Sequence, residues 1–178
     1  AFEKDTSSRQ KKGAHRPVFA DVFHEEGEIR DLPKKVHLLV NPFSGKKKGR
    51  AVAQRVIELV KEAGVDIASS YSAYSGHLVT MASALVVGKS DVIAVVGGDG
   101  SLSEAITGRM LLGKKAKDTF AIIPAGTGNS HAHDLNLSSV EQAVEAMLRG
   151  RRQALDLAKV ELTEGLPGAT GETMVRYS

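Results

Sequence analysis

The stretch Val92-Ile93-Ala94-Val95-Val96-Gly97-Gly98-Asp99-Gly100-Ser101 decides the fold of this chain. Its first half is apolar without a polar interruption, which is typical of a central strand in a parallel sheet, because both faces of such a strand are buried. Its second half combines glycine with a carboxylate and a hydroxyl, which is typical of a loop that ends a strand. The stretch therefore predicts a buried strand whose carboxyl end opens into a polar loop.

Patterns for strands and helices alternate on both sides of this stretch. Short apolar runs predict further strands at 36–40, 67–71 and 120–123. Apolar residues at helical spacing, each group followed by a glycine, predict helices at 52–63, 78–86, 102–112 and 140–148. Alternation of this kind predicts an α/β layered fold with a mostly parallel sheet.

The composition is that of an ordinary globular protein, with 42% apolar and 25% charged residues. Aromatic residues make up 4% and tryptophan is absent, which argues against an aromatic platform for nucleic-acid bases. Cysteine is absent too, which excludes disulfides and thiolate metal sites and fits a reducing compartment. No apolar run approaches the ~20 residues that cross a bilayer. We therefore expect a cytoplasmic protein without a nucleic-acid partner.

The chain divides into three parts by sequence pattern. Residues 1–33 are polar and unperiodic and form a predicted N-terminal extension, residues 34–153 hold the strand–helix alternation, and residues 154–178 turn strand-like and then glycine-rich. Basic clusters stand at 46–50, 114–117 and 149–152, and such clusters can attract phosphates or anionic membrane. A solvated face is the alternative interpretation of each cluster.

Polar, glycine-containing loops follow the four predicted strands, at 41–49, 72–77, 97–101 and 124–130. The carboxyl ends of parallel strands meet at one edge of a sheet, where helix N-termini offer free N–H groups to ligands. Glycine lets the backbone approach a phosphate, and hydroxyl or amide side chains can complete its shell. Each loop alone could be a plain turn, with Asp99 as a helix cap. Four of them at one edge predict a phosphate site, although the Walker-A and Gly-x-Gly-x-x-Gly spacings are both missing.

Three motifs in these loops resemble a known family. Asn-Pro-x-Ser-Gly at 41–45, Gly-Gly-Asp-Gly-Ser at 97–101 and Gly-Thr-Gly-Asn-Ser at 126–130 are similar, in order and spacing, to the catalytic domain of the diacylglycerol kinase, sphingosine kinase and bacterial lipid kinase family. The resemblance covers about Lys35 to Val160. It implies a two-domain enzyme that uses Mg²⁺ and transfers the γ-phosphate of ATP to the hydroxyl of a lipid such as diacylglycerol or a sphingoid base.

The resemblance also gives two of the three parts of the chain a role. Residues 34–153 would be the nucleotide-binding catalytic domain, and residues 154–178 would start a β-rich C-terminal domain that binds lipid. The implied partners are ATP, the lipid substrate and a membrane surface that the protein contacts peripherally. Part of the family's site lies in the second domain, so the nucleotide-binding half need not be active alone.

The resemblance implies a catalytic role for Asp99, as general base on the lipid hydroxyl or as organiser of Mg²⁺; no metal ligand is otherwise assigned. The residues expected around the nucleotide are Asn41, Pro42, Phe43, Ser44, Gly45, Ser72, Gly76, Gly97, Gly98, Gly100, Ser101, Glu104, Gly126, Thr127, Gly128 and Asn129. Two positions depart from the family's usual pattern. Ser130 stands where many bacterial relatives have Asp, and Ser101 replaces the usual Thr while keeping the hydroxyl.

Other functions remain open at this point. NAD kinases and phosphofructokinases also carry Gly-Gly-Asp-Gly, but neither accounts for the motifs at 41–45 and 126–130. A non-catalytic module that binds nucleotide or docks on a membrane is a further alternative, because Asp99 alone does not guarantee turnover. His131 and His133 have the alternating spacing of a metal pair, but without other close ligands we interpret them as ordinary surface or helix-start histidines.

Overall fold

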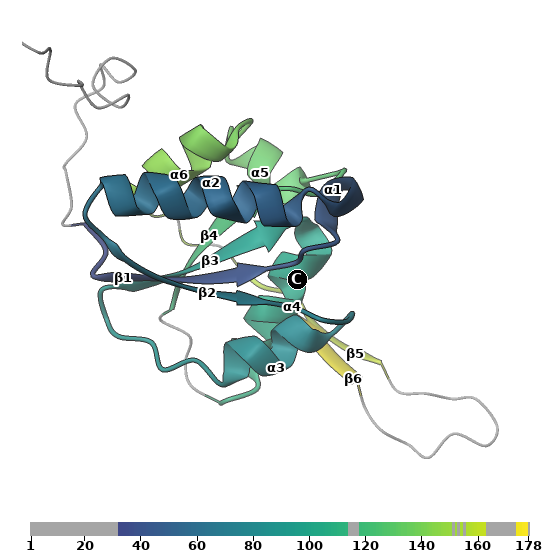
Figure 1. Ribbon diagram of the computed structural model, residues 1–178. Helices are drawn as coiled ribbons and strands as arrows, with labels where there is room; N and C mark the ends of the chain where they lie inside the picture. The colour runs from purple at the N-terminus through teal and green to yellow at the C-terminus, as the bar shows by residue number, and fades with distance from the viewer. Residues whose placement is uncertain are drawn as a thin grey trace, which may run out of the picture.

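The computed structural model describes residues 32–113, 118–150, 152, 154, 156–162 and 174–177. Along the chain, the elements are β1 (Lys35–Val40), α1 (Ser44–Lys47), α2 (Gly49–Glu62), β2 (Asp66–Tyr71), α3 (His77–Ser83), β3 (Asp91–Gly97), α4 (Asp99–Met110), β4 (Thr119–Pro124), α5 (Ser130–Asp134), α6 (Val140–Leu148), β5 (Lys159–Leu162) and β6 (Met174–Tyr177), as Figure 1 shows. Nearly all of the predicted extension at 1–33 lies outside the described residues, as do the basic cluster at 114–117 and Arg151.

Four strands form one parallel sheet in the order β2-β1-β3-β4, which confirms the predicted α/β fold. The chain moves outward from β1 to β2, and then returns to the other side of β1 to add β3 and β4. The strand order therefore reverses between β1 and β3, and in open α/β sheets ligands bind in the crevice beyond the carboxyl ends of the strands at such a point. Val40 pairs with both Tyr71 and Val96, so β1, β2 and β3 end level and their loops start together.

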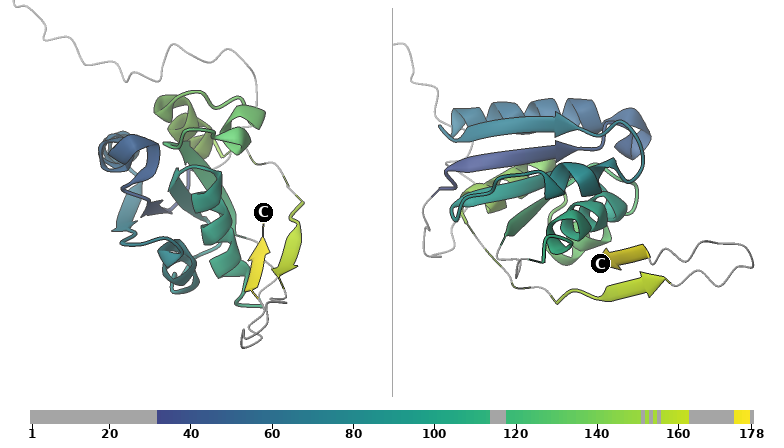
Figure 2. Two further views of the ribbon diagram at one scale, coloured as in Figure 1. Left: turned by 90° about the vertical axis from the view of Figure 1, so that its right-hand side faces the viewer. Right: turned by 90° about the horizontal axis from the view of Figure 1, so that it is seen from below.

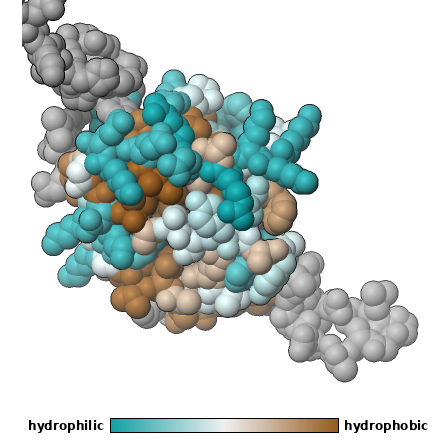
Figure 3. Space-filling view, in the orientation of Figure 1, coloured by the Kyte–Doolittle hydropathy of each residue, from teal (hydrophilic) through white to brown (hydrophobic). Residues whose placement is uncertain are grey.

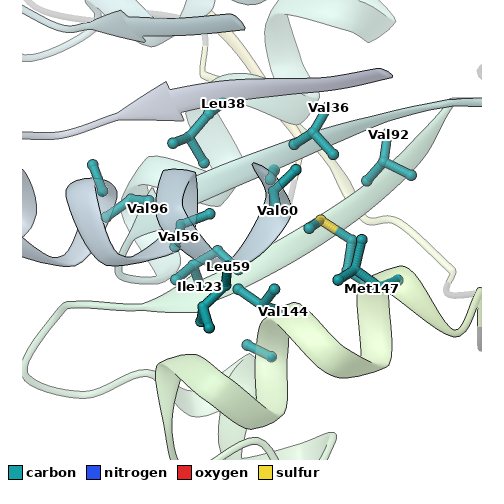
Figure 4. Packing of buried hydrophobic residues seen from close by; sticks show 14 of the residues in the cluster. Val36, Leu38, Val56, Leu59, Val60, Val92, Val96, Ile123, Val144 and Met147 are labelled. Carbon is teal, nitrogen blue, oxygen red and sulfur yellow. The ribbon is translucent and has the colours of Figure 1, made fainter. Parts of the chain in front are cut away.

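Helices cover the sheet on both faces, and each face has its own core. Residues of α2 and α6 pack on one face, and residues of α3 and α4 pack on the other (Figures 1 and 2). Figure 4 shows Leu59 of α2 and Val144 of α6 in the same cluster as Leu38 and Val96 of the sheet. The apolar strands need two covered faces, because each fully buried valine or leucine side chain contributes about 1.5–3 kcal/mol.

The helices α3 and α4 touch closely enough to require glycine at their contact. A Cβ on Gly108 would lie 2.2 Å from the carbonyl oxygen of Val79, so no larger residue fits there without moving the helices apart. Among the described residues, no helix is long and apolar enough to cross a bilayer.

The helix α3 ends at Ser83, so its predicted extension to 86 was wrong. Buried Arg109 on α4 explains the stop, because its guanidinium donates to the carbonyl oxygens of Ala82 (3.2 Å) and Leu85 (2.7 Å). A side chain thus satisfies carbonyls that a longer helix would have paired with its own N–H groups. Val86, predicted on the inner face of the helix, is 91% exposed.

Two short antiparallel strands, β5 and β6, follow the sheet domain. The strand predicted within 154–162 is observed only over Lys159–Leu162. The strand β6 lies beside α4: Ser103 Oγ donates to the carbonyl oxygen of Tyr177 (2.7 Å), and Tyr177 N–H donates to Thr107 Oγ1 (3.0 Å). Figure 2 shows the hairpin on the outer side of α4, away from the sheet. The assignment of residues 154–178 to a lipid-binding domain stays a prediction.

Candidate functional site

The loops after β1 and β3 meet where the strand order reverses. Asn41, the first residue after β1, donates through Nδ2 to the Oγ of Ser101 in the first turn of α4 (3.1 Å). Its Oδ1 accepts the backbone N–H of Phe43 (3.0 Å), which fixes the direction in which the chain leaves the strand. A Cβ on Gly97 would lie 2.5 Å from Ser101 Oγ, so only glycine at this position leaves room for the hydroxyl. Two of the three family motifs are thus joined by a direct contact.

The loop after β1 contains a short left-handed turn. Gly45, Lys46 and Lys47 have φ values of 55°, 58° and 70°, and for a residue other than glycine this conformation costs about 1–2 kcal/mol. A Cβ on Gly45 would lie 2.1 Å from the carbonyl oxygen of Ala125, so the turn packs directly on the loop after β4. Lys46, Lys47 and Lys48 are exposed, and Figure 3 shows hydrophilic side chains projecting beside α1. The strained turn places three positive charges on the rim.

The loop after β2 is tied to α4 by a carboxylate. Glu104 Oε1 accepts the backbone N–H of Gly76 at 3.0 Å, and Gly76 has the positive φ of 87° that favours glycine. His77 Nδ1 accepts the N–H of Ala73 (3.0 Å), and its ring stacks on Tyr74 with the ring centroids 4.5 Å apart. The carboxylate and the histidine together hold the loop in a defined shape at the rim.

A small open pocket of about 230 Å³ lies between these loops. Its lining consists mostly of polar residues with two aromatic rings, namely Asn41, Phe43, Ser72, Tyr74, Ser75 and Glu104. Phe43 and Tyr74 are 62% and 61% exposed, so both rings are accessible to a ligand in this pocket. The pocket can offer ring faces to a flat group and hydrogen bonds to its polar edge.

The loop after β4 lies against the loop after β3. A Cβ on Gly126 would be 2.7 Å from the Cα of Gly98, so the two backbones touch. The side chain of Asn129 closes the loop, since its Nδ2 donates to the Gly126 carbonyl (2.8 Å) and its Oδ1 accepts the Gly126 N–H (2.9 Å). Asn129 has a φ of 51°, which asparagine tolerates better than most residues.

Asp99 connects the same two loops through its carboxylate. Oδ2 accepts the backbone N–H of Ser130 (3.0 Å), and Oδ1 accepts the backbone N–H of His131 (3.1 Å). The His131 ring approaches as well, with Nδ1 2.8 Å from Oδ1. Burial raises the pKa of the Asp99 carboxyl, but the hydrogen bonds from the His131 ring and the two N–H groups outweigh it and lower the pKa from 3.8 to about 2. Asp99 is therefore ionised at neutral pH.

The structure gathers most of the predicted site residues into two adjoining groups. Asn41, Phe43, Ser72 and Glu104 line the pocket, with Gly76 hydrogen-bonded to Glu104 beside them. The second group lies where the loops after β3 and β4 meet, and comprises Gly97, Gly98, Asp99, Ser101, Gly126, Gly128 and Asn129. Pro42, Ser44 and Gly45 form the turn after β1, whereas Gly100 and Thr127 are exposed on the rim. The role of each residue stays a prediction.

The resemblance implied that the loop from Ser72 to Gly76 lies against the nucleotide but gave its member Tyr74 no separate role, and His131 was not predicted as a member of the site. Tyr74 belongs to the predicted loop at 72–77, and its aromatic ring among small polar residues was the available signal. His131 stands at the start of a helix, as interpreted, but its ring also contacts Asp99, which is 32 residues away. Only its position directly after the motif at 126–130 could have indicated this contact.

Comparison with known proteins agrees with this geometry. Residues 35–160 match the family described as the diacylglycerol kinase catalytic domain. The chain is 31% identical to sphingosine kinase 1 of Arabidopsis thaliana over 156 residues, which cover 82% of this chain and 32% of that protein. It is also 31% identical to a diacylglycerol kinase of Mycobacterium tuberculosis over 134 residues, which cover 74% of this chain and 42% of that protein.

Solved structures share the fold. A diacylglycerol kinase from Bacillus anthracis superposes with a TM-score of 0.56 at 24% sequence identity, covering 72% of this chain and 45% of that one. This likeness shows that the chain has the same α/β fold. The chain belongs to the diacylglycerol kinase catalytic domain family. It spans about a third to a half of the length of these relatives.

Proposed function

We propose that the protein containing this chain is a lipid kinase that transfers the γ-phosphate of ATP to a lipid hydroxyl, and that this chain supplies the nucleotide-binding half. The observation that carries the proposal is the direct contact of Asn41 with Ser101, which joins two phosphate-type loops at the reversal of strand order. Membership of the family supports the same reaction. It also disfavours NAD kinase-like and phosphofructokinase-like activities.

The pocket and the glycine loops suit different parts of ATP. Phe43 and Tyr74 offer exposed rings to the adenine, and the buried Ser72 lines the same pocket. The close contact of Gly98 with Gly126 leaves backbone rather than side chains at the surface of the two loops, and backbone N–H groups can approach phosphate oxygens. The exposed lysines of the turn after β1 add positive charge, which favours the triphosphate.

Mg²⁺ is the metal that phosphoryl transfer by this family implies. Among the described residues, no three metal-ligating side chains come together. A Mg²⁺ ion that binds together with the nucleotide needs fewer than three protein ligands, because it is usually held by one or two carboxylates together with phosphate oxygens and water. The Glu104 carboxylate lines the pocket and fits this need, because Oε1 accepts only the Gly76 N–H among the described hydrogen bonds and a carboxylate keeps lone pairs for a cation. The Asp99 carboxylate accepts two backbone N–H groups and likewise keeps lone pairs. Bound there, the metal would neutralise charge that develops on the phosphates.

The lipid acceptor is proposed at the level of its class, a diacylglycerol or a sphingoid base. Both present a primary hydroxyl at the surface of a bilayer, so the protein would contact the membrane peripherally. The lysines at 46–48 are exposed on the rim beside the proposed phosphate site, so an anionic membrane would bring its lipids to the same edge of the sheet.

A kinase assay on the full-length protein tests the proposal. The protein is incubated with Mg²⁺ and radiolabelled ATP, and diacylglycerol, sphingosine, NAD and fructose 6-phosphate are compared as acceptors, with products identified by mass. We expect label in one of the two lipids only. Label in NAD or fructose 6-phosphate, or saturable binding of Mg-ATP without transfer to either lipid, would contradict the proposed function.

A further inference from the structure

His77, the first residue of α3, supports the pocket without lining it. Its ring stacks on that of Tyr74, which does line the pocket, with the ring centroids 4.5 Å apart and the planes 11° from parallel. We propose that His77 is a positioning residue for nucleotide binding, which holds the Tyr74 ring so that the base of a purine nucleotide stacks on it. The inference rests on the proposed function and deepens it, because it names the residue that prepares the subsite for the base.

A tight turn brings the two rings together. The carbonyl oxygen of Tyr74 accepts the backbone N–H of His77 (3.2 Å), so these are the first and fourth residues of a β-turn. Gly76, the third residue, has a φ of 87° and a ψ of −11°, which are typical of that position in a type II turn. The first and fourth residues of such a turn lie close together, so their side chains can meet. The stacked pair is therefore a product of the local backbone.

A hydrogen bond fixes the imidazole to the backbone directly before Tyr74. Nδ1 of His77 accepts the N–H of Ala73 at 3.0 Å, so this nitrogen carries a lone pair in the observed arrangement. Ala73 follows Ser72, which is buried and whose N–H donates to the carbonyl oxygen of Val40 at the end of β1 (2.8 Å). The imidazole is thus connected to the end of the sheet, and its face supports the Tyr74 ring.

His77 covers one face of the Tyr74 ring and leaves the other available. Tyr74 is 61% exposed although one face is stacked, so the opposite face is accessible to a ligand. Nucleobases stack on such faces, and each base has a π face to offer. A ring that is already held in place loses less conformational freedom when the base binds. His77 can therefore strengthen binding without touching the nucleotide.

The loop has a second attachment that does not involve the imidazole. Glu104 Oε1 accepts the N–H of Gly76 (3.0 Å), and the Ser72 N–H continues the hydrogen bonding of the sheet. Removal of the His77 ring should therefore release the Tyr74 side chain and leave both ends of the loop in place. We expect recognition of the base to suffer, whereas binding of phosphates and stability should change little.

Calorimetric binding to the full-length protein tests this role, with Mg-ADP, Mg-UDP and magnesium tripolyphosphate as the probes. Loss of a stacking ring weakens binding of a base by about tenfold, which we expect for ADP with Tyr74→Ala. Prior fixation of one side chain is worth about threefold to tenfold in affinity, which we expect His77→Ala to lose for ADP. The smaller base of UDP should lose less, and tripolyphosphate, which has no base, should bind as before. His133→Ala is the matched control, because it removes an exposed histidine of α5.

A double-mutant cycle shows whether His77 acts through Tyr74. Once Tyr74 is alanine, the further change His77→Ala should leave ADP affinity nearly unchanged, because no ring is left to position. In the kinase assay, His77→Ala should raise the KM for ATP and keep the parental kcat. If His77→Ala melts well below the parent, His77→Asn and His77→Phe replace it in the cycle. Asparagine keeps an acceptor for the Ala73 N–H and phenylalanine keeps a ring, so each should restore part of the ADP affinity.

The outcomes distinguish the two proposals. Additive losses in the cycle, or equal losses for ADP and tripolyphosphate with His77→Ala, overturn the positioning role. A rise in the KM for the lipid alone overturns it as well. If the parent binds Mg-ADP but phosphorylates neither lipid, the proposed function is wrong, and the binding measurements still decide the role of His77. If the parent does not bind Mg-ADP, the role of His77 is wrong too.

Discussion

Gly126 lies so close to Gly98 that a Cβ on Gly126 would be 2.7 Å from the Cα of Gly98 and 2.8 Å from Oδ1 of Asn129. The contact is one-sided, because a Cβ on Gly98 would be 3.4 Å from Gly126, an ordinary packing distance. The tighter steric requirement therefore falls on the loop after β4. Residues from two separate motifs share one packed surface at the rim.

Gly126→Ala should separate these loops and weaken both folding and nucleotide binding. Overpacking of a close contact costs about 1–3 kcal/mol, and we expect a lower melting temperature and at least about tenfold weaker binding of Mg-ADP by calorimetry. Gly100→Ala is the control for stability, because its Cβ would meet nothing within 4 Å and its position is helical. Equal melting temperatures for the two variants would show that the loops do not pack in this way.

Arg109→Ala should be among the most destabilising substitutions in the sheet domain. Its guanidinium is 6% exposed, pairs with Asp118 at 2.7 Å and caps the end of α3. Removing one partner of a buried ion pair costs about 3–5 kcal/mol, which denaturant unfolding can measure. Arg55→Ala is the matched control: Arg55 pairs with Glu141 at 3.0 Å but is exposed, and such pairs contribute about 0–1 kcal/mol. Similar losses for both arginines would contradict the burial argument.

The hydrogen bonds to Asp99 should make stability depend on pH in the acid range. The folded pKa of about 2 lies below the ordinary 3.8, so this contribution is fully present above pH about 4 and is lost as the pH falls toward 2. The carboxylate is 34% exposed, and after allowance for solvent screening we expect about 1 kcal/mol. The difference in melting temperature between the parent and Asp99→Asn should therefore shrink from pH 5 to 3. A constant difference would show that the charge is not what matters.

The lysines of the turn after β1 should help to hold anions. Replacing Lys46, Lys47 and Lys48 by glutamine should weaken binding to phosphatidylserine vesicles or to Mg-ADP, most clearly at low salt, where charges on the surface are least screened. Lys61→Gln offers a control at the far end of α2, where the lysine is also exposed. If neither affinity changes in the triple variant, the lysines form a solvated face.

The sheet could be predicted because each strand corresponds to a short apolar run of neighbouring residues in the sequence. The apolar run at 92–96 identified the strand that lies between β1 and β4, and the glycines at 64, 113 and 150 correctly indicated where helices end. The end of α3 could not be predicted, since it depends on Arg109, which follows Ala82 by 27 residues. Apolar spacing alone made Val86 look like a core residue.

The details of the site were less accessible for a related reason. Lysine rarely adopts positive φ, so nothing in the sequence predicts the left-handed turn at Lys46 and Lys47. In the same turn, Gly45 packs against the carbonyl oxygen of Ala125, a residue distant in the sequence. The contact of Asp99 with His131 likewise depends on how two loops pack. The motifs identified which loops matter, whereas the fold determined which of their atoms meet.

The helix α4 contributes to the rim at its start and contacts the hairpin of β5 and β6 along its length. It begins at Asp99 in the rim, and one or two turns later Ser103 and Thr107 hold both backbone groups of Tyr177 in β6. Because one helix carries both sets of contacts, we expect a change in the position of its first turn to reach the hairpin through Ser103 and Thr107.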